Sequence, residues 1–438
     1  MILDPDKLNA ECACVSLDRG ALSRHLNTLT GDIGFAERLA ATHPTLLSNL
    51  PVFLKPDHIA RMAGIIREIE TVARLPAYQE AALSAAPAIA RFETGAIGVL
   101  MGYDFHLGKD GPKLIEINTN AGGALINAVL AEAQKACCVP ASPMLSGLAD
   151  AEDVEAAILQ SFLAEWRNER GTAPLKTVAI VDEAPQTQYL YPEFVLFQRL
   201  FQRHGIEAII IAPERLTHSG ERLHADTRPI DLVYNRMTDF SLVQPGSAAL
   251  RSAYLERHVV LTPNPQAHAI FADKRNLVRL TDGDLLRRWG VPADTAALLA
   301  SGIPKTVEVT KENASTLWAQ RSGLFFKPCS GFGSKAAYRG DKITRKVWDT
   351  ISVGGYIAQD LVPPSTRSVV IDGQRTALKA DLRNYTYNGK IQLTAARLYQ
   401  GQTTNMRTPG GGFAPVLSAR YGAAADCCIP GAEGVACL

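Results

Sequence analysis

The sequence predicts an α/β protein with three kinds of part: a helical N-terminal region, a parallel α/β domain, and lobes of α+β structure. Between Lys176 and Arg236, short apolar runs alternate with an amphipathic helical segment, which is typical of a parallel sheet covered by helices. Turn residues around Asp110 and at Asn388-Gly389 instead predict antiparallel hairpins. A length of 438 residues allows two or three domains with sizeable cores.

The composition excludes several classes of partner. Lys plus Arg total 45 against 44 for Asp plus Glu, so there is no electrostatic reason to expect nucleic acid or an anionic membrane. The eight cysteines lack the spacing of a disulfide framework or a zinc site, which favours reduced thiols. The N-terminus does not resemble a signal peptide, and no apolar stretch approaches the roughly 20 residues of a membrane span. We therefore expect a cytoplasmic protein.

Composition and periodicity divide the chain into five segments. Residues 1–96 are expected to be helices and loops, and residues 97–170 to hold a hairpin followed by helices over Ala124–Ala136 and Ala151–Asn168. Residues 171–265 form the parallel domain, with strands in TVAIVDE, EAIIIAP and IDLVYNR. Residues 266–417 hold the later strands and hairpins, and 418–438 form a tail without strong periodicity.

The hairpin of Met101–Leu107 and Lys113–Thr119 carries the most informative polar residues. If it is symmetric about Asp110, Asp104 lies directly opposite Glu116, with Asn118 on the same face as Glu116. Facing carboxylates repel each other, and Mg²⁺ bound to carboxylate and carbonyl oxygens would hold them together. The alternative is a solvated polar face.

Two lysines and a glycine-rich loop are candidates for phosphate binding. Lys274 lies in FADKRNL, and Lys327 ends an apolar strand before the loop. Glycines let backbone N–H groups approach phosphate oxygens, and lysine adds a point charge. The loop could equally be a plain hairpin turn, and Lys274 a solvated helix residue. The glycine-loop candidates are Gly331, Gly333 and Ser334.

Further candidates follow downstream. Gln359, Asp360 and Leu361 end a strand before Pro363-Pro364 and could offer backbone groups to a purine, although edge-strand polarity explains them equally. Arginines suit phosphate or carboxylate because the guanidinium binds both bidentately. The arginine-rich candidates are Arg383 and Arg397 on the Asn388-Gly389 hairpin, with Asn405 and Arg407 after it.

The hairpin register leaves one difficulty. In a regular ladder through Asn388-Gly389, Asp381 pairs with Ala396, so Arg397 faces away from Asp381 and Arg383. Either a bulge redirects one arginine, or only one of them reaches the site. Arg236, at the carboxyl end of a predicted parallel strand, is either a ligand contact or a surface cation.

Taken together, these motifs resemble the ATP-grasp ligases, most closely the glutathione synthetase-like members, over roughly 176–417 plus 97–125. The motifs are the two lysines, the KPxxGxG-like loop, the strand end before Pro363-Pro364, the DxR arm, the R…N…GG stretch and the D…ExN hairpin. The resemblance implies an ATP-grasp fold preceded by a Rossmann-like α/β domain. In the usual order the D…ExN hairpin comes last, whereas here it comes first. The chain therefore resembles a circularly permuted ATP-grasp protein.

The resemblance also implies roles for the candidate residues and ATP and Mg²⁺ as cofactors. Lys274 and Lys327 would bind the α- and β-phosphates, the Gly331–Ser334 loop would cover them, and residues 359–361 would contact adenine. The Mg²⁺ ligands would be Asp104, Glu116 and Asn118. Arg397, Arg383 and Asn405 would stabilise the transferred phosphoryl group, with Arg236 and Arg407 as substrate contacts.

The expected activity is a carboxylate–amine (or thiol) ligation through an acyl phosphate, with small-molecule or peptide acids and amines as substrates. One alternative is a phosphotransferase on the same scaffold, and another is a nucleotide-binding protein without catalysis. The sequence leaves a homodimer open.

Overall fold

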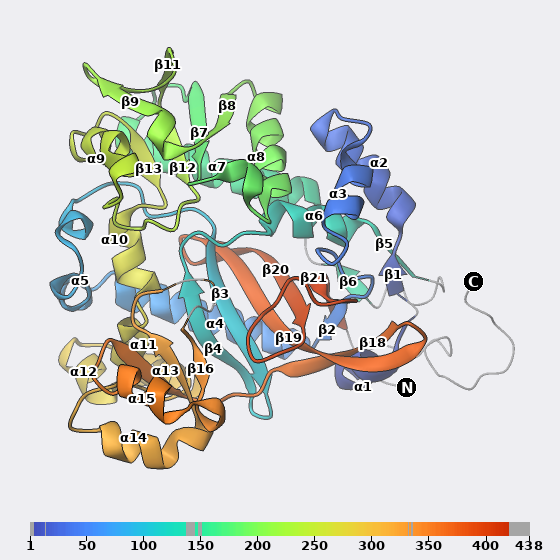
Figure 1. The fold of residues 1–438 in the computed structure, drawn as a ribbon, viewed down its shortest axis with the longest axis vertical. Helices are drawn as coiled ribbons and strands as arrows, with labels where there is room; N and C mark the ends of the chain where they lie inside the picture. The colour runs from blue at the N-terminus through green and yellow to red at the C-terminus, as the bar shows by residue number, and fades with distance from the viewer. Residues whose placement is uncertain are drawn as a thin grey trace, which may run out of the picture.

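The computed structural model describes residues 4–13, 15–136, 145–147, 151–331, 333 and 336–419. Within these residues the chain forms a parallel α/β layer, a large mixed sheet and a small α+β lobe (Figure 1). The predicted mixture of α/β and α+β parts is confirmed. None of the helices in the described part of the chain is long and apolar enough to cross a membrane.

The α/β layer contains four parallel strands in the order β13-β12-β7-β8. The three predicted apolar runs are β7, β8 and β12, whereas β13 was not predicted. The residues of β7 are all buried, as expected for a sheet covered on both faces. The strands are β7 (Thr177–Val181), β8 (Glu207–Ile211), β12 (Leu232–Asn235) and β13 (Val260–Thr262). The associated helices are α7 (Ala151–Arg170), α8 (Tyr191–Arg203) and α9 (Ala248–Leu255).

A three-stranded antiparallel sheet separates β8 from β12 in the chain, in the order β11-β10-β9. Its strands are β9 (Leu216–Ser219), β10 (Arg222–Ala225) and β11 (Arg228–Ile230). The layer is joined to the rest by α10 (Pro265–Ala267) and a turn of π-helix at His268–Ala272. Helices α11 (Arg275–Thr281), α12 (Gly283–Arg288) and α13 (Ala293–Gly302) follow.

The large sheet has the strand order β2-β21-β20-β19-β3-β4, with β18 also paired to β19 and β6 to β21. It brings the early β3–β4 hairpin beside the late β19–β20 hairpin, as Figure 1 shows. The pairing of β3 with β19 is consistent with the circular permutation predicted from the order of the motifs. The strands are β2 (Val52–Leu54), β3 (Met101–Gly108), β4 (Gly111–Asn118), β6 (Leu145–Gly147), β18 (Ser365–Ile371), β19 (Gln374–Tyr387), β20 (Lys390–Tyr399) and β21 (Gly412–Ala419).

The predicted register of the first hairpin is confirmed, because Asp104 pairs directly with Glu116 across β3 and β4. The turn holds only Lys109 and Asp110 between paired glycines, and Gly111 has φ 91°, which a residue with a Cβ rarely adopts. A regular ladder from this two-residue turn would pair Asp104 with Ile115, and a register shift between Asp104 and Phe105 brings Glu116 opposite Asp104 instead.

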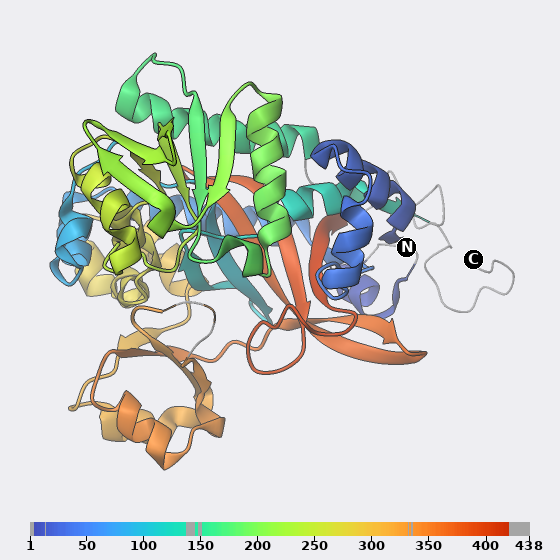
Figure 2. The ribbon, with the colours of Figure 1, turned by 45° about the horizontal axis from the view of Figure 1, so that its top comes forward.

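The small lobe is an antiparallel sheet in the order β14-β17-β15-β16, covered by two helices. Its own core includes Phe326, Trp348 and Ile351. Figure 2 shows it standing away from the large sheet, to which it is joined on both sides by single segments. The elements are β14 (Thr306–Glu308), β15 (Leu324–Pro328), β16 (Tyr338–Arg339), β17 (Tyr356–Asp360), α14 (Ala314–Gln320) and α15 (Arg345–Ile351).

The N-terminal region contains two strands that the sequence analysis did not predict. Strand β2 runs parallel to β21 at the edge of the large sheet, and β1 (Val15–Leu17) pairs with β5 (Gln134–Ala136). That pairing ends α6 at Glu132, before the expected Ala136. The helices are α1 (Pro5–Glu11), α2 (Arg19–Thr30), α3 (Phe35–Thr42), α4 (Pro56–Ala73), α5 (Pro76–Ser84) and α6 (Ala124–Glu132).

Arg367 on β18 fastens the N-terminal region to the large sheet. Its side chain is 1% exposed and donates hydrogen bonds only to backbone carbonyls, those of Asn9, Cys12, Pro51 and Ser368. Burial without a carboxylate partner lowers the pKa of Arg367 to about 10. The guanidinium therefore satisfies carbonyls at the end of α1 and before β2 that need a hydrogen-bond donor.

We predict that Arg367→Leu lowers the free energy of unfolding by about 3 kcal/mol or more, because it leaves several buried carbonyls unsatisfied. Urea denaturation measures the change. The matched control is Arg375→Leu on the neighbouring strand, since Arg375 is exposed and makes a single long contact with the Ala10 carbonyl, at 3.4 Å. Equal small losses for both variants would contradict the role given to Arg367.

Candidate active site

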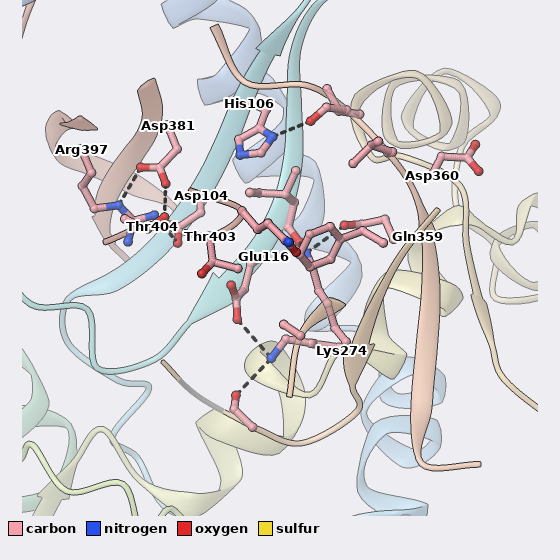
Figure 3. Close-up of a pocket in the computed structure, with 18 of the residues that line it drawn as sticks. Asp104, His106, Glu116, Lys274, Gln359, Asp360, Asp381, Arg397, Thr403 and Thr404 are labelled. Carbon is pink, nitrogen blue, oxygen red and sulfur yellow. Dashed lines mark hydrogen bonds and ion pairs between the residues drawn. The ribbon is translucent and has the colours of Figure 1, made fainter. Parts of the chain in front are cut away.

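One cavity lies where the large sheet faces the small lobe (Figure 3). Strands β3, β4, β19 and β20 supply one wall, and β15 and β17 supply the other. The residues of this cavity used below are Asp104, His106, Ile115, Glu116, Lys274, Lys327, Gly331, Gln359, Asp360, Leu361, Val362, Asp381, Arg397, Thr403 and Thr404. Most of the residues predicted for a nucleotide and metal site therefore line one space.

A carboxylate between two guanidinium groups forms one end of the cavity. Asp104 is 2% exposed, and its Oδ1 accepts a hydrogen bond from Arg383 Nε at 2.6 Å. Its Oδ2 accepts from Arg383 at 2.6 Å, from Arg397 at 2.9 Å and from Asn118 Nδ2 at 3.1 Å. Burial alone would raise the pKa of Asp104, but the two arginines hold it below the ordinary aspartate value. The carboxylate is thus ionised and surrounded by donors.

A bulge in the second hairpin brings Arg397 to this cluster. The register of β19 and β20 shifts between Tyr385 and Thr386, so Asp381 pairs with Arg397 instead of Ala396. Arg397 Nε donates to Asp381 Oδ1 at 2.6 Å, on the same sheet face as Arg383. Of the two alternatives left by the sequence, the bulge is the correct one. A shift by one residue turns every later side chain to the other face.

Gly102 makes room for this cluster. A Cβ at Gly102 would lie 2.6 Å from the Ala121 side chain and 3.2 Å from Arg383 Nε. Gly102 also stands opposite Tyr385 of β19, two pairs along from Arg383 and Asp104. A larger residue would push the guanidinium away from its carboxylate.

The second carboxylate, Glu116, contacts the lysines. Lys274 Nζ lies 3.1 Å from Glu116 Oε1 and 3.1 Å from the carbonyl of Gly331, which it draws toward the sheet. Although burial opposes ionisation, Lys274 and Lys327 keep the pKa of Glu116 below its ordinary value. Lys274 is the N-cap residue of α11, where its side chain reaches the cavity, and not part of a helix face.

Lys327 connects the small lobe to the hairpin. Its Nζ donates to the Ile115 carbonyl at 2.7 Å and to Gln359 Oε1 at 2.9 Å. Burial, only partly offset by Glu116, lowers the pKa of Lys327 to about 8. The hydrogen bond from Lys327 to the Ile115 carbonyl therefore crosses the gap between the two walls.

These contacts hold the cavity closed. Its volume is about 90 Å³, well below the roughly 300 Å³ at which drug-sized ligand pockets begin.

Several expected site residues are not among those lining the cavity. Arg236 is buried in the α/β layer, where it donates to the Asn120 carbonyl at 2.7 Å and stacks over Tyr234 and Phe194. Asn405 and Arg407 are exposed in the loop after β20. Arg407 lies over Tyr189 at a second cavity, because the loop turns outward beyond Thr404.

The remaining expected residues lie close to the cavity, except for one that is outside the described residues. Asn118 and Arg383 contact the cavity through Asp104. Gly333 is described but does not line the cavity, and Ser334 lies outside the described residues.

Two cavity residues were not predicted as functional. Thr404 Oγ1 donates to Asp381 Oδ2 at 2.6 Å, so the loop after β20 closes over the arginine cluster. The QTTN sequence of that loop shows no recognisable pattern. His106 also lines the cavity, and its Nδ1 lies 2.6 Å from the Val362 carbonyl. Burial lowers the pKa of His106, so its imidazole is neutral near pH 7.

Comparison with known proteins gives a fold but no close relative. No family model and no curated protein matches the sequence. A glutathione synthetase-like effector from Globodera pallida, in its apo form, matches with a TM-score of 0.53 and 11% identity, covering 91% of this chain and 97% of that one. The chain has a glutathione synthetase-like ATP-grasp fold. At 11% identity the likeness establishes the fold alone, so the fold predicted from the motifs is confirmed while the roles of individual residues are not thereby fixed.

Two further matches have lower scores. A proposed gamma-glutamylcysteine synthetase from Methylobacillus flagellatus KT has a TM-score of 0.45 and 12% identity, covering 81% of this chain and 85% of that one. D-alanyl-alanine synthetase A from Vibrio cholerae has a TM-score of 0.26 and 14% identity, covering 49% of this chain and 69% of that one.

We predict that Asp104→Asn lowers the free energy of unfolding by about 3–5 kcal/mol, because it leaves the buried guanidinium of Arg383 without its carboxylate and Arg397 with Asp381 alone. Since the pKa of Asp104 is depressed in the folded state, its contribution is complete above the unfolded pKa of about 3.9 and is lost only as the pH falls below that value. Urea titrations at pH 8, 7 and 5 should therefore give the same difference from the unaltered protein. Asp110→Asn, in the exposed hairpin turn, is the control, and a difference that changes between pH 8 and 5 would refute the assignment.

Proposed function

We propose that this protein is an ATP- and Mg²⁺-dependent ligase that activates a carboxylate as an acyl phosphate and passes the acyl group to an amine or a thiol. The observation that carries the proposal is a cavity between two lobes whose lining combines cations and carboxylates. The cations that line it are Lys274, Lys327 and Arg397, the carboxylates include Asp104, Glu116 and Asp381, and Arg383 reaches the cavity through its ion pair with Asp104. Such a set suits a polyphosphate with its metal, since phosphoryl transfer needs positioning and charge neutralisation more than a protein nucleophile.

The lysines are proposed to bind the nucleotide phosphates. Both bond protein oxygens that a phosphate oxygen could replace, on the hairpin, on Gln359 and on the Gly331 carbonyl. Residues Gln359–Leu361 line the same cavity at the end of β17, where their backbone is available to an adenine edge. The Gly331 loop would cover the phosphates once the small lobe has opened and closed again.

Glu116 and Asn118 fit a magnesium ion better than Asp104 does. Among the described hydrogen bonds, none uses Glu116 Oε2 or Asn118 Oδ1, and both are hard oxygen donors of the kind that Mg²⁺ prefers. Asp104, expected as a third ligand, is already surrounded by Arg383, Arg397 and Asn118. We infer that Asp104 orients the arginines instead. The bound ion would supply charge neutralisation at the phosphate oxygens.

Arg397 and Arg383 are proposed to act on the substrate carboxylate and the transferred phosphoryl group. A carboxylate oxygen attacks the γ-phosphorus, the bond to the ADP oxygen breaks, and an acyl phosphate forms. An amine or thiol then attacks the acyl carbon, inorganic phosphate leaves, and the nucleophile loses its proton. Arg397 lines the cavity with a fixed orientation, because Asp104 and Asp381 hold two sides of its guanidinium. Preorganised cations of this kind stabilise developing charge without reorganising.

We predict that binding of a non-hydrolysable ATP analogue weakens as the pH rises through about 8, because Lys327 then loses its charge. Above that pH the affinity should fall up to tenfold per pH unit. Lys327→Arg, which stays charged, should bind with little dependence between pH 7 and 9.5. Calorimetry measures both proteins, and the same pH dependence in both would show that Lys327 does not contact the phosphates.

Turnover distinguishes a ligase from the alternatives. Phosphate release from ATP should require both an acid and a nucleophile, and Glu116→Gln should lower kcat at least a hundredfold while altering the Mg²⁺ dependence of nucleotide binding. Glu132→Gln, on α6 away from the cavity, is the control. A phosphorylated product from one substrate alone would indicate a phosphotransferase. Tight nucleotide binding without turnover for any acid–nucleophile pair would indicate a binding protein.

A further inference from the structure

A larger cavity, of about 1030 Å³, lies at the carboxyl ends of the parallel strands. The segments that follow β7 and β12 supply Glu183 and Thr238–Ser241, and Pro265 follows β13. In parallel α/β sheets this edge is where ligands bind. The volume is at the upper end of the range for small-molecule sites.

This cavity adjoins the nucleotide cavity through the chain itself. Asp273 and Ser330 line the larger cavity, and the residues that follow them, Lys274 and Gly331, line the smaller one. His268, also in its wall, lies with Nδ1 3.2 Å from the hydroxyl of Thr119, the residue after Asn118. A molecule bound in the larger cavity would thus extend toward the phosphates bound in the smaller one.

The charged lining is acidic. Glu183, Glu214 and Asp239 line the cavity, and the ion pairs among the described residues include none of the three. The positive group, Arg275, is already held by Asp273, with Nε and a terminal nitrogen bonded to its two oxygens at 3.0 and 2.5 Å. Desolvation and nearby Lys274 lower the pKa of His268 to about 4, so that ring is neutral at pH 7. Three carboxylates remain uncompensated.

Hydrogen bonds fix two of these carboxylates in place. Asp239 is 8% exposed and accepts from the backbone N–H groups of Val243 and Gln244 and from the hydroxyl of Ser247. Glu183 Oε1 accepts from the backbone and the hydroxyl of Thr238 and from the Asp239 N–H. Among the described hydrogen bonds none uses Glu183 Oε2. That oxygen is available to a ligand at a position the fold holds constant.

We propose that this cavity selects the nucleophile of the ligation and that the nucleophile is a diamine or polyamine. The inference rests on the proposed ligase function. One protonated amino group would be bound by Glu183, Glu214 and Asp239, because preformed carboxylates attract and orient an ammonium group. A second, deprotonated amino group would attack the acyl carbon, so that an amide forms, inorganic phosphate leaves, and the proton passes to solvent. An amino acid would instead bring its own carboxylate beside three others, where like charges repel.

Calorimetry with spermidine as the probe tests the binding directly, without ATP. We expect spermidine to bind with an affinity that falls steeply with added salt, and 1-aminobutane and succinate to bind at least tenfold more weakly. Glu183→Gln and Glu214→Gln should each weaken spermidine binding about tenfold while leaving ATP-analogue affinity unchanged. Glu221→Gln, on the exposed turn between β9 and β10, should change neither. Because Glu214 is exposed, its variant carries little risk of misfolding.

The outcomes separate this inference from the ligase proposal. Spermidine binding that survives both glutamate substitutions, or turnover only with zwitterionic or neutral nucleophiles, overturns the inference while the ligase stands. Spermidine binding that depends on Glu183 and Glu214, without phosphate release in the presence of any acid, supports the cation site and refutes the ligase.

Discussion

The Asp104 carboxylate, held between the guanidinium groups of Arg383 and Arg397, is the interaction on which the arrangement of the site depends. Asp104 lies on β3, Arg383 on β19 and Arg397 on β20, so the ion pairs require three strands to be in register at once. The desolvation of three buried charges is offset only when all their hydrogen bonds form. Any slip of either hairpin would therefore bury an unpaired charge, and the cluster specifies one register for the sheet.

The same charges explain the small volume of the cavity, about 90 Å³. Lys274, Lys327 and Arg397 each contact a protein oxygen. These oxygens belong to carboxylates or to the carbonyls of Ile115 and Gly331. These contacts link the small lobe to the hairpin, yet each is of a kind that a phosphate oxygen can replace at similar cost. Under the proposed function, a phosphate ligand would supply the anionic oxygens that replace these contacts, so that nucleotide binding would be coupled to movement of the small lobe. The small lobe has its own apolar core, so it can move without exposing that of the large sheet.

The two cavities differ in electrostatic character although they share neighbouring residues. The smaller one has Lys274, Lys327 and Arg397 among its carboxylates, whereas the larger one has Glu183, Glu214 and Asp239, which none of the described ion pairs includes. Under the proposed function, this difference would let a phosphorylated acid and an amine bind in adjacent regions. At Asp273-Lys274 and at Ser330-Gly331, the first residue lines the larger cavity and the second lines the smaller one.

Sequence alone determined the elements with strong local signals. Alternation and turn residues indicated the β3–β4 hairpin and the pairing of Asp104 with Glu116, although that pairing depends on a register shift between Asp104 and Phe105. Apolar runs indicated three of the four parallel strands. The glycine-loop and lysine motifs identified residues that converge on one cavity. Tertiary structure alone decided the bulge beyond Tyr385 that turns Arg397 inward, the pairing of β2 with β21, and the burial of Arg236 away from the cavity. Local pattern specifies which face a side chain occupies within a regular ladder. It does not encode where a ladder breaks or which distant segments share a wall, because those depend on packing between residues far apart in the chain.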